Sequence, residues 1–217
     1  MTSTPTRTLV IDTATAACSV ALIEGGAVVA RLHEVVERGH AERLVPMIAD
    51  LPGGGRADAI LVDCGPGSFT GLRVGIAAAR GLGLGWGVPV HGYSSLALIA
   101  AAGFRDWRCD TLAVVIEGGH GEVFMQRFAA TLDTLAPLVS LKPDAAIAAI
   151  GAVPAVGNGA ARLRAADPAV DATDALPDAA DVILLPTALV TLPPRPIYGR
   201  APDAKLPQRA PGARVTS

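Results

Sequence analysis

Residues 62–75 read VDCGPGSFTGLRVG and connect a short apolar run to a long helical pattern. The continuously apolar residues 59–63 predict a strand that is buried on both faces. The glycines that follow predict a tight turn, and residues 70–85 predict a helix. Such a turn directs backbone N–H groups and the positive end of the helix dipole towards one point. This stretch therefore predicts an α/β fold with a loop that suits a phosphate group.

Two explanations of the glycine-rich turn stay open. The turn is not a P-loop, and its spacing, G-x-G-x-x-x-G, is one residue longer than the dinucleotide-binding fingerprint. A vestigial phosphate site would use Gly65, Gly67 and Ser68, with Asp12 and Thr13 from the end of the first predicted strand. The simpler explanation is that the glycines only permit a tight turn and that Asp12 closes a turn with its own backbone.

The helix predicted after the turn carries a stripe of small residues at every fourth position. The stripe consists of Gly71, Gly75, Ala79 and Gly83. Small residues allow another backbone to approach closely, and that backbone could belong to the protein's own sheet or to a partner. Arg73 and Arg80 lie on one side of the same helix, where they could meet carboxylates or a phosphate of a partner.

The segments around this stretch predict two lobes. Residues 111–117 and 122–128 repeat the order of strand, acidic residue, turn and strand seen near the N-terminus, which suggests a duplicated architecture. The expected domains are a first lobe at 1–102, a smaller second lobe at 103–201 and a loosely ordered tail at 202–217. The first lobe is also predicted to contain an antiparallel meander at residues 8–14, 18–24 and 27–33, a helix at 40–51, a short strand from 89–90 and a helix at 94–102.

Composition and charge exclude several functions. The net charge is -2 and the basic residues are scattered, so the sequence lacks the basic stripe that binds a phosphate backbone. The four histidines and the serines show no metal-binding or nucleophile spacing, so we expect neither a metal site nor a catalytic residue. Three widely spaced cysteines suggest buried thiols, and no apolar run reaches the about 18 residues of a membrane span. We expect a cytoplasmic protein.

Several stretches resemble the TsaB (YeaZ-type) family, in the same order along the chain. The most specific is GPGSFTGLRVGIAAARGLGLG at residues 65–85, and the others are residues 9–24, 40–48, 121–124 and 196–205. The resemblance implies the two-lobed fold of actin, heat-shock chaperone ATPases and sugar kinases. Each lobe of that fold is a ribonuclease-H-like mixed sheet flanked by helices.

The resemblance also implies a function. A TsaB-type chain is expected to be a non-catalytic subunit that binds and activates a TsaD-type paralogue, which forms N6-threonylcarbamoyladenosine at position 37 of tRNAs. A TsaE-type ATPase completes the complex, tRNA is contacted through the complex, and ATP or ADP with magnesium is expected only there. The chain alone could form a homodimer. The alternative is a nucleotide-dependent phosphotransferase or hydrolase of the same superfold.

For the site, the resemblance implies that the helices at 40–51 and 70–85 form a bundle with the same helices of TsaD. It favours a partner, rather than the protein's own sheet, as the neighbour of the small-residue stripe. Gly199 departs from the family pattern, because it replaces a bulky apolar residue. The expected interface residues are His40, Leu44, Met47, Ile48, Gly71, Arg73, Gly75, Ala79, Arg80 and Gly83.

Overall fold

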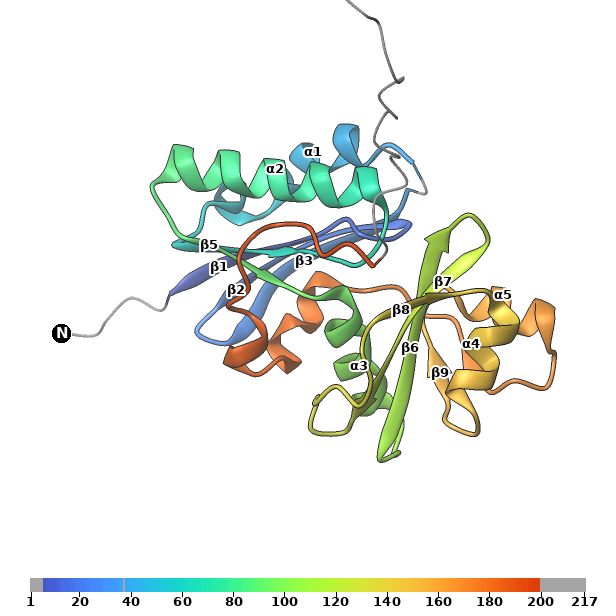
Figure 1. The fold of residues 1–217 in the computed structure, drawn as a ribbon. Helices are drawn as coiled ribbons and strands as arrows, with labels where there is room; N and C mark the ends of the chain where they lie inside the picture. Colours follow the sequence, from blue (N-terminus) through green and yellow to red (C-terminus); the bar gives the residue numbers. More distant parts are fainter. Residues whose placement is uncertain (1–5, 37, 200–217) are drawn as a thin grey trace, which may run out of the picture.

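The computed structural model describes residues 6–36 and 38–199, which form two lobes, each built on a five-stranded sheet (Figure 1). The first sheet has the order β3-β2-β1-β4-β5, in which β1 is antiparallel to β2 and parallel to β4. Its strands are β1 (Arg7–Asp12), β2 (Ala17–Glu24), β3 (Ala27–Val35), β4 (Ala59–Asp63) and β5 (Val90–Tyr93). The predicted meander and the predicted buried strand are therefore confirmed.

The second lobe repeats this topology. Its sheet, written from the opposite edge, has the order β8-β7-β6-β9-β10, with β6 antiparallel to β7 and parallel to β9. The strands are β6 (Thr111–Gly119), β7 (Glu122–Ala129), β8 (Val139–Leu141), β9 (Ala155–Val156) and β10 (Ala172–Thr173). Since the first and second sheets share one strand order, the predicted fold class, with two mixed sheets flanked by helices, is confirmed.

The helices cover the sheets in layers. Two of them, α1 (His40–Asp50) and α2 (Phe69–Trp86), lie side by side on one face of the first sheet (Figure 1). In the second lobe, α4 (Pro143–Ile150) and α5 (Ala160–Ala166) pack together on that sheet's outer side. Short 3-10 turns are η1 (Pro52–Gly55), η2 (Ala179–Leu184) and η3 (Thr187–Leu189). None of the helices in the described part of the chain has the length and apolarity of a membrane crossing.

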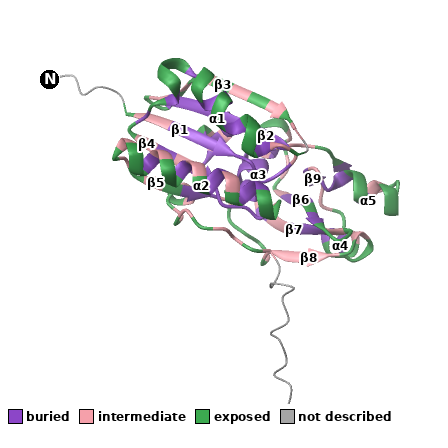
Figure 2. Cartoon of the chain, turned by 90° about the horizontal axis from the view of Figure 1, so that it is seen from above, coloured by how far each residue is buried: buried purple, intermediate pink, exposed green. Residues whose placement is uncertain are grey.

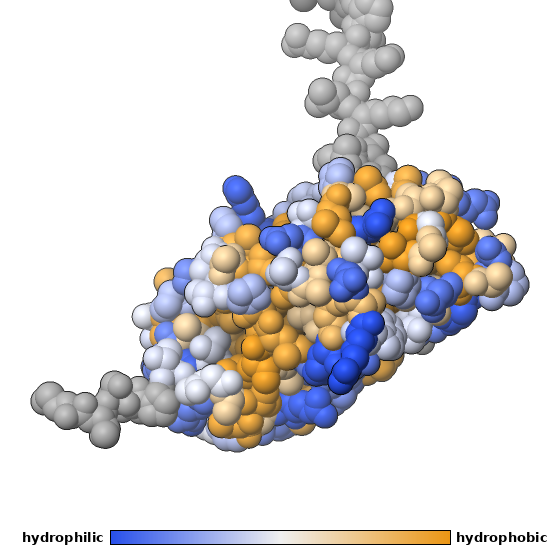
Figure 3. All heavy atoms as spheres, turned by 90° about the horizontal axis from the view of Figure 1, so that it is seen from below, coloured by the Kyte–Doolittle hydropathy of each residue, from blue (hydrophilic) through white to orange (hydrophobic). Residues whose placement is uncertain are grey.

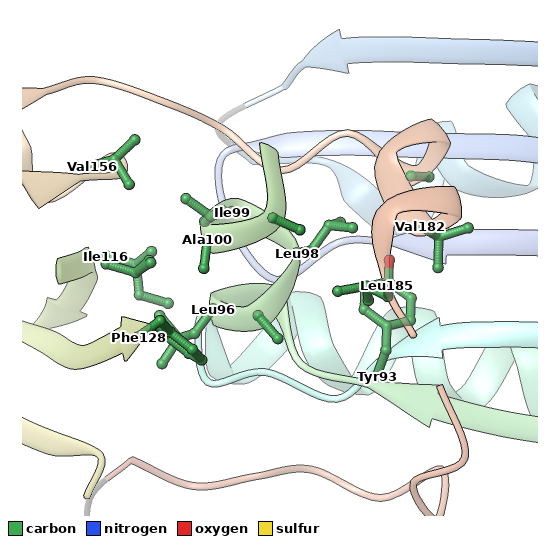
Figure 4. Packing of buried hydrophobic residues seen from close by; sticks show 14 of the residues in the cluster. Tyr93, Leu96, Leu98, Ile99, Ala100, Ile116, Phe128, Val156, Val182 and Leu185 are labelled. Carbon is green, nitrogen blue, oxygen red and sulfur yellow. The ribbon is translucent and has the colours of Figure 1, made fainter. Parts of the chain in front are cut away.

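The helix α3 (Ser95–Asp106) forms the core between the lobes. Figure 4 shows its side chains directed to both sides. Leu96 and Ala100 belong to one buried cluster with Ile116 and Phe128 of the second sheet. The same cluster includes Tyr93 and other residues of the first lobe. Burial of apolar area on both sides of one helix therefore holds the two sheets together.

The structure moves the predicted lobe boundaries. Residues 103–106 are the last turn of α3, and residues 178–199 return to the first lobe. There η2 packs on β1, β2 and β3, and Leu192 forms an antiparallel bridge with Gly92 of β5. The second lobe therefore extends from about the start of β6 to the end of β10. The predicted tail at 202–217 lies outside the described residues.

The structure also corrects the interpretation of the small-residue stripe. A Cβ atom at Gly71 would overlap the carbonyl oxygen of Thr13, and one at Gly75 would overlap the hydroxyl of Thr13. Ala79 is fully buried, and a Cβ atom at Gly83 would overlap the side chain of Val90. The stripe therefore seats α2 on its own sheet, and the prediction that it faces a partner is wrong.

This packing predicts opposite effects for two glycine-to-alanine substitutions in α2. Gly75→Ala forces the new methyl group against Thr13 and should lower the free energy of unfolding by about 1–3 kcal/mol. Gly81 is exposed and has free space around its Cα, so Gly81→Ala should raise it by about 0.5–1 kcal/mol. Urea unfolding monitored by circular dichroism measures both values. A harmless Gly75→Ala would show that the stripe is not seated on the sheet.

Candidate functional site

The glycine-rich loop, for which a vestigial phosphate site was one of two open explanations, is closed by a second loop of the same chain. Residues 13–16, here called the first loop, lie directly against residues 64–68, the glycine-rich loop. The N–H of Ser68 donates to the carbonyl of Ala14 (2.7 Å), and a Cβ atom at Gly67 would overlap that carbonyl. The hydroxyl of Thr13 donates to the carbonyl of Gly71 (2.8 Å). No room for a phosphate group is left between these backbones.

The remaining phosphate candidates are engaged elsewhere. Both carboxylate oxygens of Asp12 accept hydrogen bonds, one from the N–H of Ala14 (3.3 Å) and one from the hydroxyl of Tyr93 (3.0 Å), and Asp12 is fully buried. Gly65 is buried with φ at 94°, and its N–H donates to Asp63 (2.8 Å). The interpretation of Asp12 and Gly65 as phosphate-binding residues is therefore not supported by the geometry.

The start of α1 is fixed to the first loop as well. His40 is the first residue of α1 and is buried, and its Nε2 lies 2.9 Å from the carbonyl of Thr15. Ser68 is the N-cap of α2, where its hydroxyl accepts from the N–H of Gly71 (3.2 Å). Both helices thus begin at one compact junction, which fixes their positions relative to each other.

A cleft of about 1200 Å³ lies between the lobes and is lined by Gly67 and Ser68, but not by Asp12. The segment 192–199 is here called the strap, and its last three residues, Ile197, Tyr198 and Gly199, line the cleft. The strap is attached to the first lobe, because the N–H of Ile197 donates to the carbonyl of Cys64 (2.7 Å). Two residues further along, a Cβ atom at Gly199 would lie 2.5 Å from the ring of Phe124 in the second lobe. This contact explains why glycine replaces the bulky residue of the family pattern.

The exposed sides of α1 and α2 carry several apolar residues. We call this surface the outer face, and it consists of Ala41, Val45, Ala77, Gly81 and Leu84. Val45 is 60% exposed and Leu84 is 86% exposed, which are high values for large aliphatic side chains. Figure 2 looks onto this side of the molecule and shows exposed residues along both helices. The outer face is therefore available to a partner.

The predicted interface residues divide into two groups. Eight of the ten are buried beneath the helices, where the α1 members pack into the core of the first lobe: His40, Leu44, Met47, Ile48, Gly71, Gly75, Ala79 and Gly83. They are wrong as surface contacts. Arg73 and Arg80 are exposed, as expected. The guanidinium of Arg73 stacks 3.6 Å from the ring centre of Phe69, and Arg80 donates to the carbonyl of Pro194 in the strap (2.6 Å).

The apolar residues of α1 recur at spacings of three and four, which by itself predicts a single apolar face. That pattern groups Ala41 and Val45 with Leu44 and Ile48, although only the latter two are buried. The sequence does contain a signal, because Ala41 and Val45 form their own i, i+4 pair about 60° around the helix from the core pair. Leu84 gives a similar signal, because it comes directly after Gly83 and therefore lies outside the side of α2 that carries the small-residue stripe.

The fold and this site define a class of protein. It has two lobes that share one strand order, a closed junction between two loops, and apolar residues on the exposed sides of two helices. Among the described residues, no cluster of three His, Cys, Asp or Glu side chains could hold a metal ion. These features describe a two-lobed α/β protein in which two neighbouring helices begin at one closed loop junction.

Comparisons with known proteins give the family. Residues 32–158 match the family model described as TsaD: tRNA N6-adenosine threonylcarbamoyltransferase. The chain is 40% identical over 127 residues to the tRNA threonylcarbamoyladenosine biosynthesis protein TsaB of Escherichia coli (strain K12), which covers 56% of this chain and 54% of that protein. The structure of YeaZ from Pseudomonas aeruginosa superposes with a TM-score of 0.74 at 30% identity, covering 89% of this chain and 99% of that one.

The chain belongs to this family and is of the TsaB/YeaZ type. The chain spans about half the length of the TsaB proteins that it matches in Escherichia coli and Haemophilus influenzae. The similarity is longer to an uncharacterized protein of Mycobacterium tuberculosis (strain ATCC 25618 / H37Rv), which is 35% identical over 214 residues, 91% of this chain and 93% of that protein. The family resemblance noted in the sequence is thereby confirmed.

The closed junction predicts the response to nucleotides. Because the two loops contact each other directly, ATP with magnesium should release no heat of binding to the isolated chain in isothermal titration calorimetry. Asp12→Asn should leave this result unchanged, since Asp12 does not line the cleft. Saturable binding that Asp12→Asn abolishes would show instead that the junction opens to receive a phosphate.

Proposed function

We propose that this chain is a docking subunit that binds and activates a TsaD-type transferase in the formation of N6-threonylcarbamoyladenosine at position 37 of tRNAs. The relatives named TsaB are described as proteins of tRNA threonylcarbamoyladenosine biosynthesis, and the matching family model is that of the transferase itself. A paralogue of the transferase is well suited to pair with it, because two chains of one fold can use equivalent surfaces on each other.

The observation that carries the proposal is the outer face of α1 and α2. Large exposed aliphatic side chains together with small neighbours mark interaction surfaces on soluble proteins. Val45 and Leu84 supply the large side chains, and Ala77 and Gly81 lie beside Leu84 along α2. Small residues at this face let the partner's helices approach closely, so a four-helix contact fits this surface.

Exposure of apolar side chains alone does not identify the outer face as the docking surface. Figure 3 shows the opposite side of the molecule, where hydrophobic residues also reach the surface between hydrophilic ones. The outer face differs because its apolar residues repeat at helical spacing on two adjacent helices, whose starts are fixed at the loop junction. A rigid surface binds at a lower entropic cost than a loop does.

We propose a non-catalytic role for this chain in the complex. The buried position of Asp12 and the closed loop junction support this role over a nucleotide-dependent phosphotransferase or hydrolase. A TsaE-type ATPase would join the assembly, tRNA would be contacted through it, and ATP or ADP with magnesium would bind only there. In the absence of the transferase, the same outer face would pair with a second copy of this chain in the cytoplasm.

The proposal predicts the effect of a charge on the outer face. Leu84→Glu places a carboxylate on the outer face at its most exposed large apolar residue and should weaken binding to the cognate TsaD-type protein at least about tenfold. The matched control is Leu135→Glu, because Leu135 is an exposed leucine, at 49%, in the second lobe. Light scattering and titration calorimetry of the mixed proteins measure the complex.

Two outcomes would contradict the proposal. If the unmodified chain forms no complex with the transferase, the docking function itself is wrong. If the complex forms and Leu84→Glu weakens it no more than Leu135→Glu does, the function stands but the outer face is not its surface. Circular dichroism of both variants checks that each is folded.

A further inference from the structure

Two buried carboxyl groups lie side by side at the carboxyl ends of neighbouring strands in the first lobe. β1 and β4 run parallel with Ile11 opposite Val62, so the next residues, Asp12 and Asp63, are neighbours. Both are buried, at 0% and 2% exposure. The next strand, β5, places Tyr93 opposite Asp63. Three polar side chains therefore form a row across the sheet, beneath the loop junction.

Hydrogen bonds account for three of the four carboxylate oxygens. Both oxygens of Asp12 accept bonds, and Oδ1 of Asp63 accepts from the N–H groups of Gly65 (2.8 Å) and Ser95 (2.9 Å). Oδ2 of Asp63 is buried and has no hydrogen-bond partner within the described chain. A buried carboxylate oxygen without a donor is costly, so this atom needs either a proton of its own or a cation.

The surroundings of the pair favour a proton. None of the ion pairs among the described residues includes Asp12 or Asp63. Neither residue lines the cleft between the lobes, and the backbones above them are in contact. A hydrated ion needs a cavity with several oxygen ligands, whereas a proton needs only the two oxygens themselves.

The other groups that face the pair stay uncharged or are already paired. They are Tyr93 of β5, Cys18 of β2, Cys64 after β4 and Asp178 before η2, whose carboxylate forms an ion pair with Arg31 (3.0 Å). Burial raises the pKa of Cys18 to about 11 and that of Cys64 to about 12. Burial and the neighbouring carboxylates also raise the pKa of Tyr93 well above its usual value.

We propose that Asp12 and Asp63 hold one proton between them and that this proton closes the loop junction. The proton is carried on Oδ2 of Asp63 and is donated to Asp12, which leaves one negative charge shared by the pair. The bonded N–H groups then connect the pair to the structure above it: Ala14 in the first loop, Gly65 in the glycine-rich loop and Ser95 at the start of α3. Loss of the proton places two like charges in a dry site and loosens all three attachments.

The pKa shifts agree with this arrangement. Burial is the main cause that raises the pKa of Asp12 to about 7, and burial with the charge of Asp12 holds the pKa of Asp63 well above its usual range. Because both pKa values are higher in the folded state than in the unfolded chain, the folded state binds more protons. The contribution of the pair to stability is therefore greatest at acidic pH, falls as Asp12 ionises through about pH 7, and is lost as the pH rises further through the higher pKa of Asp63.

The experiment compares thermal unfolding of the full chain and of Asp63→Asn between about pH 5 and about pH 9. In Asp63→Asn, Oδ1 keeps its two donors and the new amide nitrogen replaces the proton as a permanent donor to Asp12. We expect the unfolding temperature of the native chain to fall across this range. The unfolding temperature of the Asp63→Asn variant should fall less, and the variant should be the more stable protein at alkaline pH. The control is Asp144→Asn, which removes an exposed carboxylate from the second lobe and should follow the native profile.

A second measurement does not depend on the folding of any variant. Infrared spectra of the native chain should show the carbonyl stretch of a protonated carboxyl group near neutral pH. Exposed aspartates do not contribute to this band, because neutral pH is far above their pKa. Amide exchange of Ala14, Gly65 and Ser95, corrected for intrinsic rates, should become faster as this band disappears.

Three results would overturn the proposal. The first is a native chain and an Asp63→Asn variant with the same dependence of stability on pH. The second is the absence of the protonated-carboxyl band at neutral pH. The third is stability at alkaline pH that added magnesium restores, which would show that the pair binds a cation instead of a proton.

Discussion

The close approach of two backbones at the loop junction is the constraint on which the rest of this structure depends. The carbonyls of Thr13 and Ala14 press against Gly71 and Gly67, at positions where any side chain would overlap them. Because only glycine allows this approach, the first turn of α2 can sit directly on the end of β1. The position of α2, and of α1 beside it, follows from this contact.

The same contact determines which side of α2 is buried and which side is exposed. The small residues of α2 pack against the protein's own first lobe, whereas Ala77, Gly81 and Leu84 lie on the solvent side. The junction also fills the place where a phosphate would sit in an enzyme of this shape. A loop junction without room for a phosphate group and a fixed position of α1 and α2 are thus two consequences of one packing arrangement, which supports the proposed role as a subunit that assists a catalytic paralogue.

Three structural features lie at or near the boundary between the two lobes. The apolar residues of α3 pack between the sheets, the strap connects Cys64 with Phe124, and the buried Asp12 and Asp63 lie beneath the loops that border the cleft. Apolar packing is insensitive to pH, whereas a buried acid pair is not. The rigidity of the junction therefore has a protonation-dependent part that the family pattern around residues 65–85 does not reveal.

The sequence by itself determined the two-lobed fold, most of the helices and strands, and the family, because these follow from local periodicity and from the GPGSFTGLR segment. The resemblance also indicated α1 and α2 as the helices of the proposed docking surface. Only the tertiary structure decided which side of each helix is free, since a stripe such as Gly71 to Gly83 fits a sheet and a partner helix equally well. Likewise, Asp63 gains its meaning only when parallel pairing brings it beside Asp12, a contact between residues 51 positions apart that no local pattern encodes.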